Sequence, residues 1–359
     1  MPSGISKKGA RATDGIITRY FEHLPVSDAT PIITLGEGAT PLIRSDRLSE
    51  KANAEVWLKY EGLNPTGSFK DRGMTLAISK ALEEGSGAVV CASTGNTSAS
   101  AAAYAARAGM TCAVLIPGGN VARGKLAQAS MHGARVLEID DNFDRALQLV
   151  KEVARDHPVT VVNSTNPYRI EGQKTASFEI VEALGRAPDL HLMPVGNAGN
   201  ITAYWQGYRE ARENGWSSSL PRMFGWQAEG AAPIVRGEIV ESPATVATAI
   251  RIGNPASWRG AIEAASASAG AIGEVTDDEI IAAHRSLAQE GVFVELASAA
   301  GVAGLERMIL SGVVEAGTTI VCVLTGHGLK DSDWALESSS PPISIKSDSD
   351  SLLAAMNLI

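Results

Sequence analysis

The chain has 359 residues, of which 45% are hydrophobic and 20% are charged, and it carries a formal net charge of -9. This length can bury a large core and favours about two domains. The acidic balance argues against nucleic acid as a partner, and without a signal-peptide core or an apolar run near the roughly 20 residues of a membrane span, we expect a cytoplasmic protein that binds no membrane.

Near the N-terminus, residues 16–21 place apolar side chains at helical spacing. This predicts a short helix that packs on a neighbouring element or on a partner subunit. Strands are predicted over residues 57–61, 88–92, 111–116, 134–139 and 159–162, with helical stretches between them. Alternating strands and helices of this kind are typical of an α/β fold with a mostly parallel sheet.

The stretch NPTGSFKDRG at residues 64–73 sets Lys70 between turn residues and a helical run that reaches Leu82. Pro65 and Gly67 indicate a loop, and Ser68 is a candidate cap for the helix. A lysine held and partly desolvated at such a junction spends time as the neutral amine that attacks an aldehyde. The motif alone fits a solvated surface lysine as well.

A polar turn at residues 93–98 follows the strand over 88–92 and opens an Ala-rich helix. Ser93, Thr94, Asn96 and Thr97 bring hydroxyl and amide groups to the positive end of this helix, where a carboxylate or phosphate is readily held. The alternative is that these side chains only cap the helix. A P-loop-like stretch follows at 119–125, but Leu126 stands where magnesium binding needs Ser or Thr, so we expect a turn that enters a helix.

A second anion site is predicted after the strand over 159–162. Arg169 offers a fork that matches phosphate oxygens, Asn163 and Ser164 add neutral donors, and Thr97 reaches in from the other turn. A solvated or helix-capping arginine is the alternative reading of Arg169.

Two further strands, at residues 191–195 and 320–324, also end in polar turns. The first leads into a phosphate cradle made of Gly196, Asn197, Ala198, Gly199 and Asn200. Its Gly-x-x-Gly spacing does not fit the dinucleotide fingerprint. The second ends in Thr325. Because ligands bind at the carboxyl ends of parallel strands, we expect these turns to face one site.

The cysteines and histidines indicate no metal site. Cys91, Cys112 and Cys322 lie in apolar runs without paired spacing, so we expect buried free thiols, and the histidines lack the spacing of metal ligands.

Together, the motifs at 64–73, 93–98, 196–200 and 325–331 resemble the threonine synthases, a family of fold-type-II pyridoxal 5′-phosphate enzymes, over residues 36 to about 330. The resemblance implies a tryptophan synthase β-like fold of two three-layer α/β/α domains, with the cofactor in the cleft between them. We expect a small domain over 61–156, which carries the lysine and the substrate-carboxylate loop, and a large cofactor-binding domain over 1–60 and 157–359. A homodimer is also implied.

The resemblance also assigns roles to single residues. Lys70 forms the Schiff base with the cofactor, Asn96 bonds its ring hydroxyl, residues 196–200 hold its phosphate, and Thr325 meets its pyridine nitrogen. The substrate-binding residues that it implies are Ser93, Thr94, Thr97, Asn163, Ser164 and Arg169. A hydroxyl partner leaves the pyridine nitrogen largely unprotonated, which suits elimination and replacement at the β and γ carbons.

The reaction implied is the conversion of O-phospho-L-homoserine and water to L-threonine and phosphate, with Lys70 as the main proton carrier and the released phosphate as a helper. The alternatives are a serine/threonine dehydratase or another β-replacement enzyme of the same fold type, and a non-catalytic cofactor-binding sensor. Glu295 stays open, since it either faces the cofactor ring or caps a strand end, and Leu296 stands where the relatives usually have proline.

Overall fold

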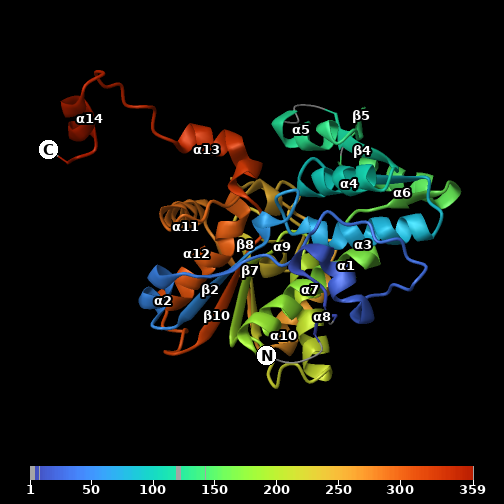
Figure 1. The fold of residues 1–359 in the computed structure, drawn as a ribbon, viewed down its shortest axis with the longest axis horizontal. Helices are drawn as coiled ribbons and strands as arrows, with labels where there is room; N and C mark the ends of the chain where they lie inside the picture. Colours follow the sequence, from blue (N-terminus) through green and yellow to red (C-terminus); the bar gives the residue numbers. More distant parts are fainter. Residues whose placement is uncertain (1–4, 8, 119–122, 142, 359) are drawn as a thin grey trace.

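The computed structural model describes residues 5–7, 9–118, 123–141 and 143–358. Two sheets organise these residues, in separate parts of the molecule (Figure 1). The larger sheet has the order β1-β2-β10-β7-β8-β9, with strands Leu42–Arg44, Glu55–Tyr60, Thr319–Leu324, Leu190–Pro194, Arg222–Ala228 and Ala271–Val275. The smaller sheet has the order β5-β4-β3-β6, with strands Arg135–Ile139, Thr111–Pro117, Ala88–Ala92 and Val159–Val161.

Helices cover both faces of these sheets. The α-helices are Gly15–Arg19 (α1), Asp46–Ala52 (α2), Lys70–Glu83 (α3), Asn96–Arg107 (α4), Arg123–Met131 (α5), Phe143–Asp156 (α6), Pro167–Leu184 (α7), Gly199–Glu213 (α8), Pro233–Arg236 (α9), Trp258–Ala267 (α10), Asp277–Gln289 (α11), Leu296–Leu310 (α12), Ser332–Ser338 (α13) and Ser349–Ala355 (α14). Short 3-10 helices span Ala12–Asp14, Phe21–His23, Glu61–Leu63, Thr248–Ile250 and Gly328–Asp331 (η5). No helix among the described residues is long and apolar enough to span a membrane.

The strands of the larger sheet bury side chains on both faces, as expected of a covered parallel sheet. Along β10, Ile320, Cys322 and Leu324 enter the core beneath α2, α11 and α12, whereas Val321 and Val323 enter the core beneath α1, α7, α8 and α10. Only β1 pairs antiparallel, with β2. The predicted α/β class with mostly parallel sheets is therefore confirmed.

The smaller sheet is similarly enclosed, by α3, α4 and α5 on one face and α6 on the other. Its fourth strand, β6, pairs with β3 and reaches Val161, so the sheet continues past the predicted domain boundary at residue 156.

The predicted N-terminal helix is present as α1, whose Ile16 and Ile17 are buried in the core beside α7 and α8. The three cysteines are buried and unpaired, as predicted. In the P-loop-like stretch, residues 119–122 lie outside the described residues, and α5 begins at Arg123. At the other end, α13 and α14 lead away from the rest of the molecule (Figure 1).

Candidate active site

Five parallel strands, β2, β3, β6, β7 and β10, end in the loops that carry the predicted site residues. The lysine loop after β2 is hydrogen bonded to the loop after β10, since the Phe69 N–H donates to the Thr325 carbonyl at 3.0 Å and Ser68 forms a β-bridge with Gly326. Helix α3 begins at Lys70 and has no side-chain cap, although the Ser68 hydroxyl accepts the Lys70 N–H at 3.4 Å. The backbone therefore fixes Lys70 beside Thr325.

Asp71 ties the lysine loop to helix α4. Its buried carboxylate accepts from the Thr66 N–H at 2.7 Å, from the Thr66 hydroxyl at 2.6 Å and from the Ser100 hydroxyl of α4 at 2.6 Å. Burial raises the pKa of Asp71 to about 6, although these hydrogen bonds act in the opposite direction. The start of α3 and the start of α4 thus share one anchor.

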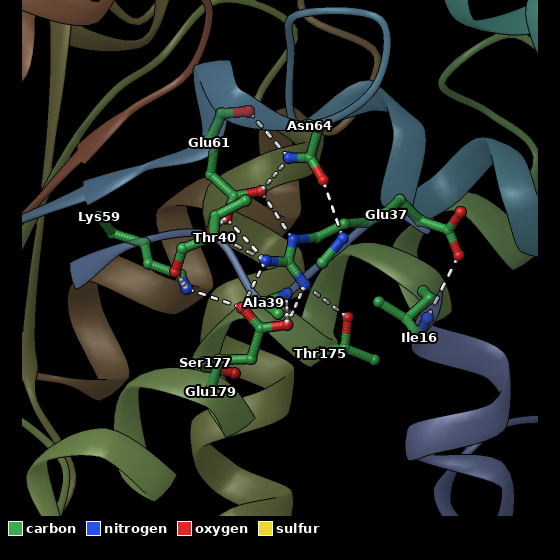
Figure 2. A network of polar contacts seen from close by, with 12 residues as sticks. Ile16, Glu37, Ala39, Thr40, Lys59, Glu61, Asn64, Thr175, Ser177 and Glu179 are labelled. Carbon is green, nitrogen blue, oxygen red and sulfur yellow. Dashed lines mark hydrogen bonds and ion pairs between the residues drawn. The ribbon is translucent and has the colours of Figure 1, made fainter. Parts of the chain in front are cut away.

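Behind the lysine loop, a buried network of charges fixes the first turn of α3 (Figure 2). Arg72 donates through Nε to Glu61 at 2.6 Å and through Nη2 to Glu179 of α7 at 2.6 Å. Lys59 donates to the same Glu179 at 2.7 Å, and Asn64 donates to Glu61 at 3.1 Å. Burial would raise the pKa of Glu179, but the charges of Arg72 and Lys59 outweigh it and hold this pKa well below its usual range. The network holds the loop firmly against α7.

The Lys70 amine is poised to lose its proton near neutral pH. Burial lowers the pKa of Lys70 to about 7, the positive charge of Arg169 acts in the same direction, and the Glu295 carboxylate opposes both. At such a pKa, a large fraction of the amine is uncharged and nucleophilic at neutral pH.

Arg169, in the first turn of α7, is a buried cation with no acidic partner among the described residues. Arg169 is only 1% exposed. Its Nη1 donates to the Val162 carbonyl at 3.2 Å, whereas Nε and Nη2 have no partner among the described residues. Burial lowers the pKa of Arg169 to about 10. Buried polar groups are nearly always hydrogen bonded, so two free guanidinium nitrogens indicate a place for an anion.

Asn163 and Ser164, which lie just beyond the end of β6, already form some of their hydrogen bonds. Asn163 accepts from the Ala92 N–H at 3.0 Å and donates to the Ala92 carbonyl at 2.8 Å, so it joins the ends of β6 and β3 and keeps one amide hydrogen for a ligand. Ser164 accepts a hydrogen bond from the Asn197 side chain. The predicted anion site and the predicted phosphate cradle therefore touch through Ser164 and Asn197.

The cradle at residues 196–200 is a tight turn between β7 and α8. Ala198 adopts a left-handed conformation with a φ of 64°, and α8 begins directly after it, where the first N–H groups of a helix lack acceptors within the helix. A Cβ at Gly196 would lie 2.9 Å from the Ile250 backbone, whereas one at Gly199 would meet protein only at 3.5 Å. Both polar atoms of the buried Asn200 side chain lack partners among the described residues. This turn has the form of an anion cradle.

Asn96 and Thr325 meet at one buried carboxylate. Asn96, the first residue of α4, donates to Glu295 Oε2 at 2.8 Å, and the Thr325 hydroxyl donates to Glu295 Oε1 at 2.9 Å. Thr325 follows β10, as predicted, and is 5% exposed. Residues about 230 positions apart in the chain, 96 and 325, are thereby brought to one point.

Ser93 and Thr94 lie in the turn between β3 and α4, whereas Thr97, predicted to lie in the same turn, is the second residue of α4, and all three are partly buried. The Ser93 hydroxyl accepts from the Gly95 N–H at 3.2 Å. Within the described ranges, no side-chain hydrogen bond joins these three residues to the other predicted site residues.

Glu295 and Ser298 belong to the site but were not assigned to it from the sequence. Glu295 precedes α12, and the Ser298 hydroxyl lies 3.0 Å from that of Thr325. In the sequence, these two residues are marked only as an acidic and a hydroxyl side chain at the start of an apolar helical run. No group of His, Cys, Asp and Glu side chains in the described part of the chain could hold a metal ion.

Comparison with known proteins gives a consistent result. The profile of the pyridoxal-phosphate dependent enzymes matches residues 33–326. Threonine synthase of Halalkalibacterium halodurans is 60% identical over 90% of this chain and 91% of its own length. Threonine synthase of Mycobacterium leprae is 61% identical over 90% of both chains, and that of Methanocaldococcus jannaschii is 48% identical over 96% of this chain and 88% of its own.

Among solved structures, a processed threonine deaminase from Solanum lycopersicum superposes with a TM-score of 0.72 at 21% identity, over 83% of this chain and 87% of that one. Maize serine racemase gives a TM-score of 0.70 at 22% identity, over 83% and 92% of the two chains. At these identities the likeness concerns the fold.

Proposed function

The chain belongs to the pyridoxal-phosphate-dependent enzymes and, within them, to the threonine synthases, and from this premise we propose how its residues perform the reaction. The enzyme is a lyase that uses pyridoxal 5′-phosphate to convert O-phospho-L-homoserine and water into L-threonine and phosphate. We place the active site in the loops that follow the carboxyl ends of β2, β3, β6, β7 and β10.

The residues fit this cofactor. The turn over residues 196–200 offers N–H groups and the unpartnered Asn200 amide to the cofactor phosphate, and Lys70 offers a neutral amine for a covalent bond to the aldehyde. Asn96 and Thr325 would contact the ring hydroxyl and the ring nitrogen. Pyridoxal 5′-phosphate, when bound, supplies the electron withdrawal that lets hydrogens leave the substrate carbons.

The observation that carries the substrate assignment is that Nε and Nη2 of the buried Arg169 have no partner among the described residues. With Nε and Nη2 free, the guanidinium can hold the substrate phosphate in a bidentate manner. Ser164 and the remaining amide hydrogen of Asn163 would add neutral donors, and Thr97 would approach from the start of α4. A dehydratase substrate carries no phosphate and would leave this buried cation unpaired.

Ser93 and Thr94, in the turn that opens α4, would hold the substrate carboxylate through their hydroxyl groups and the adjacent helix N-terminus. Lys70 would move protons at the substrate α and β carbons, because its amine can both accept and return a proton near neutral pH. The buried anchors of Asp71 and Arg72 keep that amine in place.

The test is phosphate release from O-phospho-L-homoserine by the cofactor-loaded enzyme, with threonine identified in the same sample. For Arg169→Met we expect KM for the phosphorylated substrate to rise about 10- to 100-fold, which corresponds to the loss of charge-assisted hydrogen bonds. Arg186→Met, which removes a partly exposed arginine paired with Asp189, is the control and should leave KM unchanged. An unchanged KM in Arg169→Met would remove this residue from the phosphate site.

The proposal also covers the domain division, the oligomeric state and the cellular location. We take the smaller sheet and its helices as the small domain and the larger sheet as the cofactor domain, with β6 on the small side of the boundary because it pairs with β3. The enzyme is proposed to be a cytoplasmic homodimer, which sedimentation of the purified protein and fractionation of cells would test.

A further inference from the structure

The Glu295 carboxylate contacts both residues that we assign to the polar atoms of the cofactor ring. Glu295 is 2% exposed, and its two oxygens accept from Asn96 at 2.8 Å and from Thr325 at 2.9 Å. The fit is close, since a Cβ at Gly326 would lie 2.4 Å from the Glu295 carboxyl carbon. The carboxylate therefore has little freedom to turn away.

The hydrogen bonds around Thr325 show where the hydroxyl hydrogens of Ser298 and Thr325 are directed. The Ser298 hydroxyl accepts the Gly326 N–H at 3.0 Å, and its own hydrogen has the Thr325 oxygen at 3.0 Å as its nearer acceptor, compared with the Gly326 carbonyl at 3.4 Å. Thr325 then has one hydrogen left, and in this structure that hydrogen is directed to Glu295. A hydroxyl has a single hydrogen to donate, so it cannot be given to Glu295 and to a ring nitrogen at once.

Charges of both signs face Glu295. Asp331 of η5 is an acidic neighbour, Lys330 of the same segment and Lys70 of α3 are basic ones, and Asn96 and Thr325 supply the neutral donors. Burial raises the pKa of Glu295, Asp331 raises it further, and the hydrogen bonds from Asn96 and Thr325 and the charge of Lys330 act against this. These neighbours therefore act on the proton affinity of Glu295 in both directions.

We propose that Glu295 is a positioning residue that decides whether Thr325 presents a hydrogen or a lone pair to the ring nitrogen of the bound cofactor. The inference rests on the proposed placement of Thr325 at that nitrogen. When Glu295 carries a proton, it donates to Thr325 Oγ1, and the Thr325 hydrogen turns outward to an unprotonated ring nitrogen. When Glu295 is ionised, it takes the Thr325 hydrogen, and the ring nitrogen must carry the proton itself. The two arrangements contain the same number of protons, so Glu295 and the ring nitrogen share one proton through Thr325.

The test is NMR of the holoenzyme loaded with cofactor that is isotopically labelled at the ring nitrogen, because this chemical shift reports protonation directly. Glu295→Gln fixes the neutral arrangement, since its amide can donate to Thr325 and its carbonyl can accept from Asn96. Because the two arrangements contain the same number of protons, their ratio does not depend on pH, and the shifts are compared at one pH. We expect a shift toward the protonated value in the wild type, where the Thr325 hydrogen is directed to Glu295, and the unprotonated value in Glu295→Gln. The same shift in both proteins would overturn the inference.

Two further variants make the result independent of any loss of folding in Glu295→Gln. Asp331→Asn keeps Glu295 but removes its acidic neighbour, so Glu295 should hold the shared proton less often. At the same pH the shift should move further toward the protonated value, and this effect should vanish when Thr325→Val is added. A shift that does not move in Asp331→Asn contradicts the proposal. Glu306→Gln, on the same helix α12 and paired with Lys51 at the surface, is the matched control and should follow the wild type.

The variants distinguish a failure of the proposed role of Glu295 from a failure of the proposed placement of Thr325 at the ring nitrogen. If the labelled cofactor binds but its ring nitrogen is indifferent to Thr325→Val as well, the placement of Thr325 at the ring nitrogen fails. If Thr325→Val alters the shift and Glu295→Gln does not, the placement stands and the role of Glu295 fails.

Discussion

At the scale of single residues, the chemistry depends on a lysine whose pKa is lowered by a nearby arginine. Arg169 lowers the pKa of Lys70, after the larger effect of burial. The cation that we propose as the binding site of the substrate phosphate therefore also favours the neutral, reactive form of the lysine amine before substrate binds. Binding of an anion at Arg169 would weaken this effect and return basicity to the amine at the step where it must accept a proton.

This coupling predicts the pH dependence of cofactor capture. The rate at which the apoprotein binds pyridoxal 5′-phosphate should rise with pH through a midpoint near 7 and level off at higher pH, because only the neutral form of Lys70 attacks the aldehyde. In Arg169→Met, the removal of the positive neighbour should move the midpoint to higher pH. Stopped-flow absorbance measures both profiles, and a rate that is flat across neutral pH would contradict the role of Lys70.

Replacement of Lys70 gives a second residue-level prediction. Lys70→Ala should lower the rate of phosphate release about 1,000-fold, in the range found when a general acid–base group is removed, and an added small amine should restore part of it. Activity that persists in Lys70→Ala without added amine would exclude Lys70 as the proton carrier.

At the scale of elements, the first turn of α3 is fixed by the buried network around Arg72. We expect Arg72→Met to lower the free energy of unfolding by about 3–5 kcal/mol, because Glu61 and Glu179 would each lose a buried partner. Urea unfolding of the apoprotein measures this loss. The control is Lys51→Met, which removes a partly exposed ion pair with Glu306 and should cost less than about 1 kcal/mol. Equal losses in the two variants would contradict the structural importance of the network.

The elements that carry the site could be predicted from the sequence because each one is marked by residues that are close together in the chain. An apolar run followed by glycine, hydroxyl or amide residues predicts both a strand and a polar turn at its end, and the turns that contain Asn96, Asn200 and Thr325 were recognised in this way. Arg72 and Glu179 gave no such signal, since they are 107 positions apart and become partners only when α3 packs on α7. Glu295 remained undecided for the same reason, because its partners Asn96 and Thr325 come from opposite sheets.

At the scale of the whole molecule, the two sheets meet at the lysine loop, and the C-terminal segment takes little part. Residues 339–348 are exposed, and Leu352 and Met356 of the last helical segment are 49% and 56% exposed. Deletion of residues 339–359 should therefore change the free energy of unfolding by less than about 0.5 kcal/mol and leave phosphate release unaltered. A fall in activity that depends on protein concentration would instead place this segment against a second subunit.

The order of strands in the larger sheet has a consequence for synthesis on the ribosome. β10 lies between β2 and β7, so the N-terminal strand β2 has no parallel neighbour until residues 319–324 have been made. At about 5–20 residues per second, the interval between Tyr60 and Thr319 lasts roughly 10 to 50 seconds. The smaller sheet is encoded within residues 88–161 and can close during that time. The nascent chain therefore carries a finished small sheet and an exposed β2 edge. The turn after β7, which we propose as the cofactor phosphate site, is complete before β10, whose end we place at the ring nitrogen, has been translated.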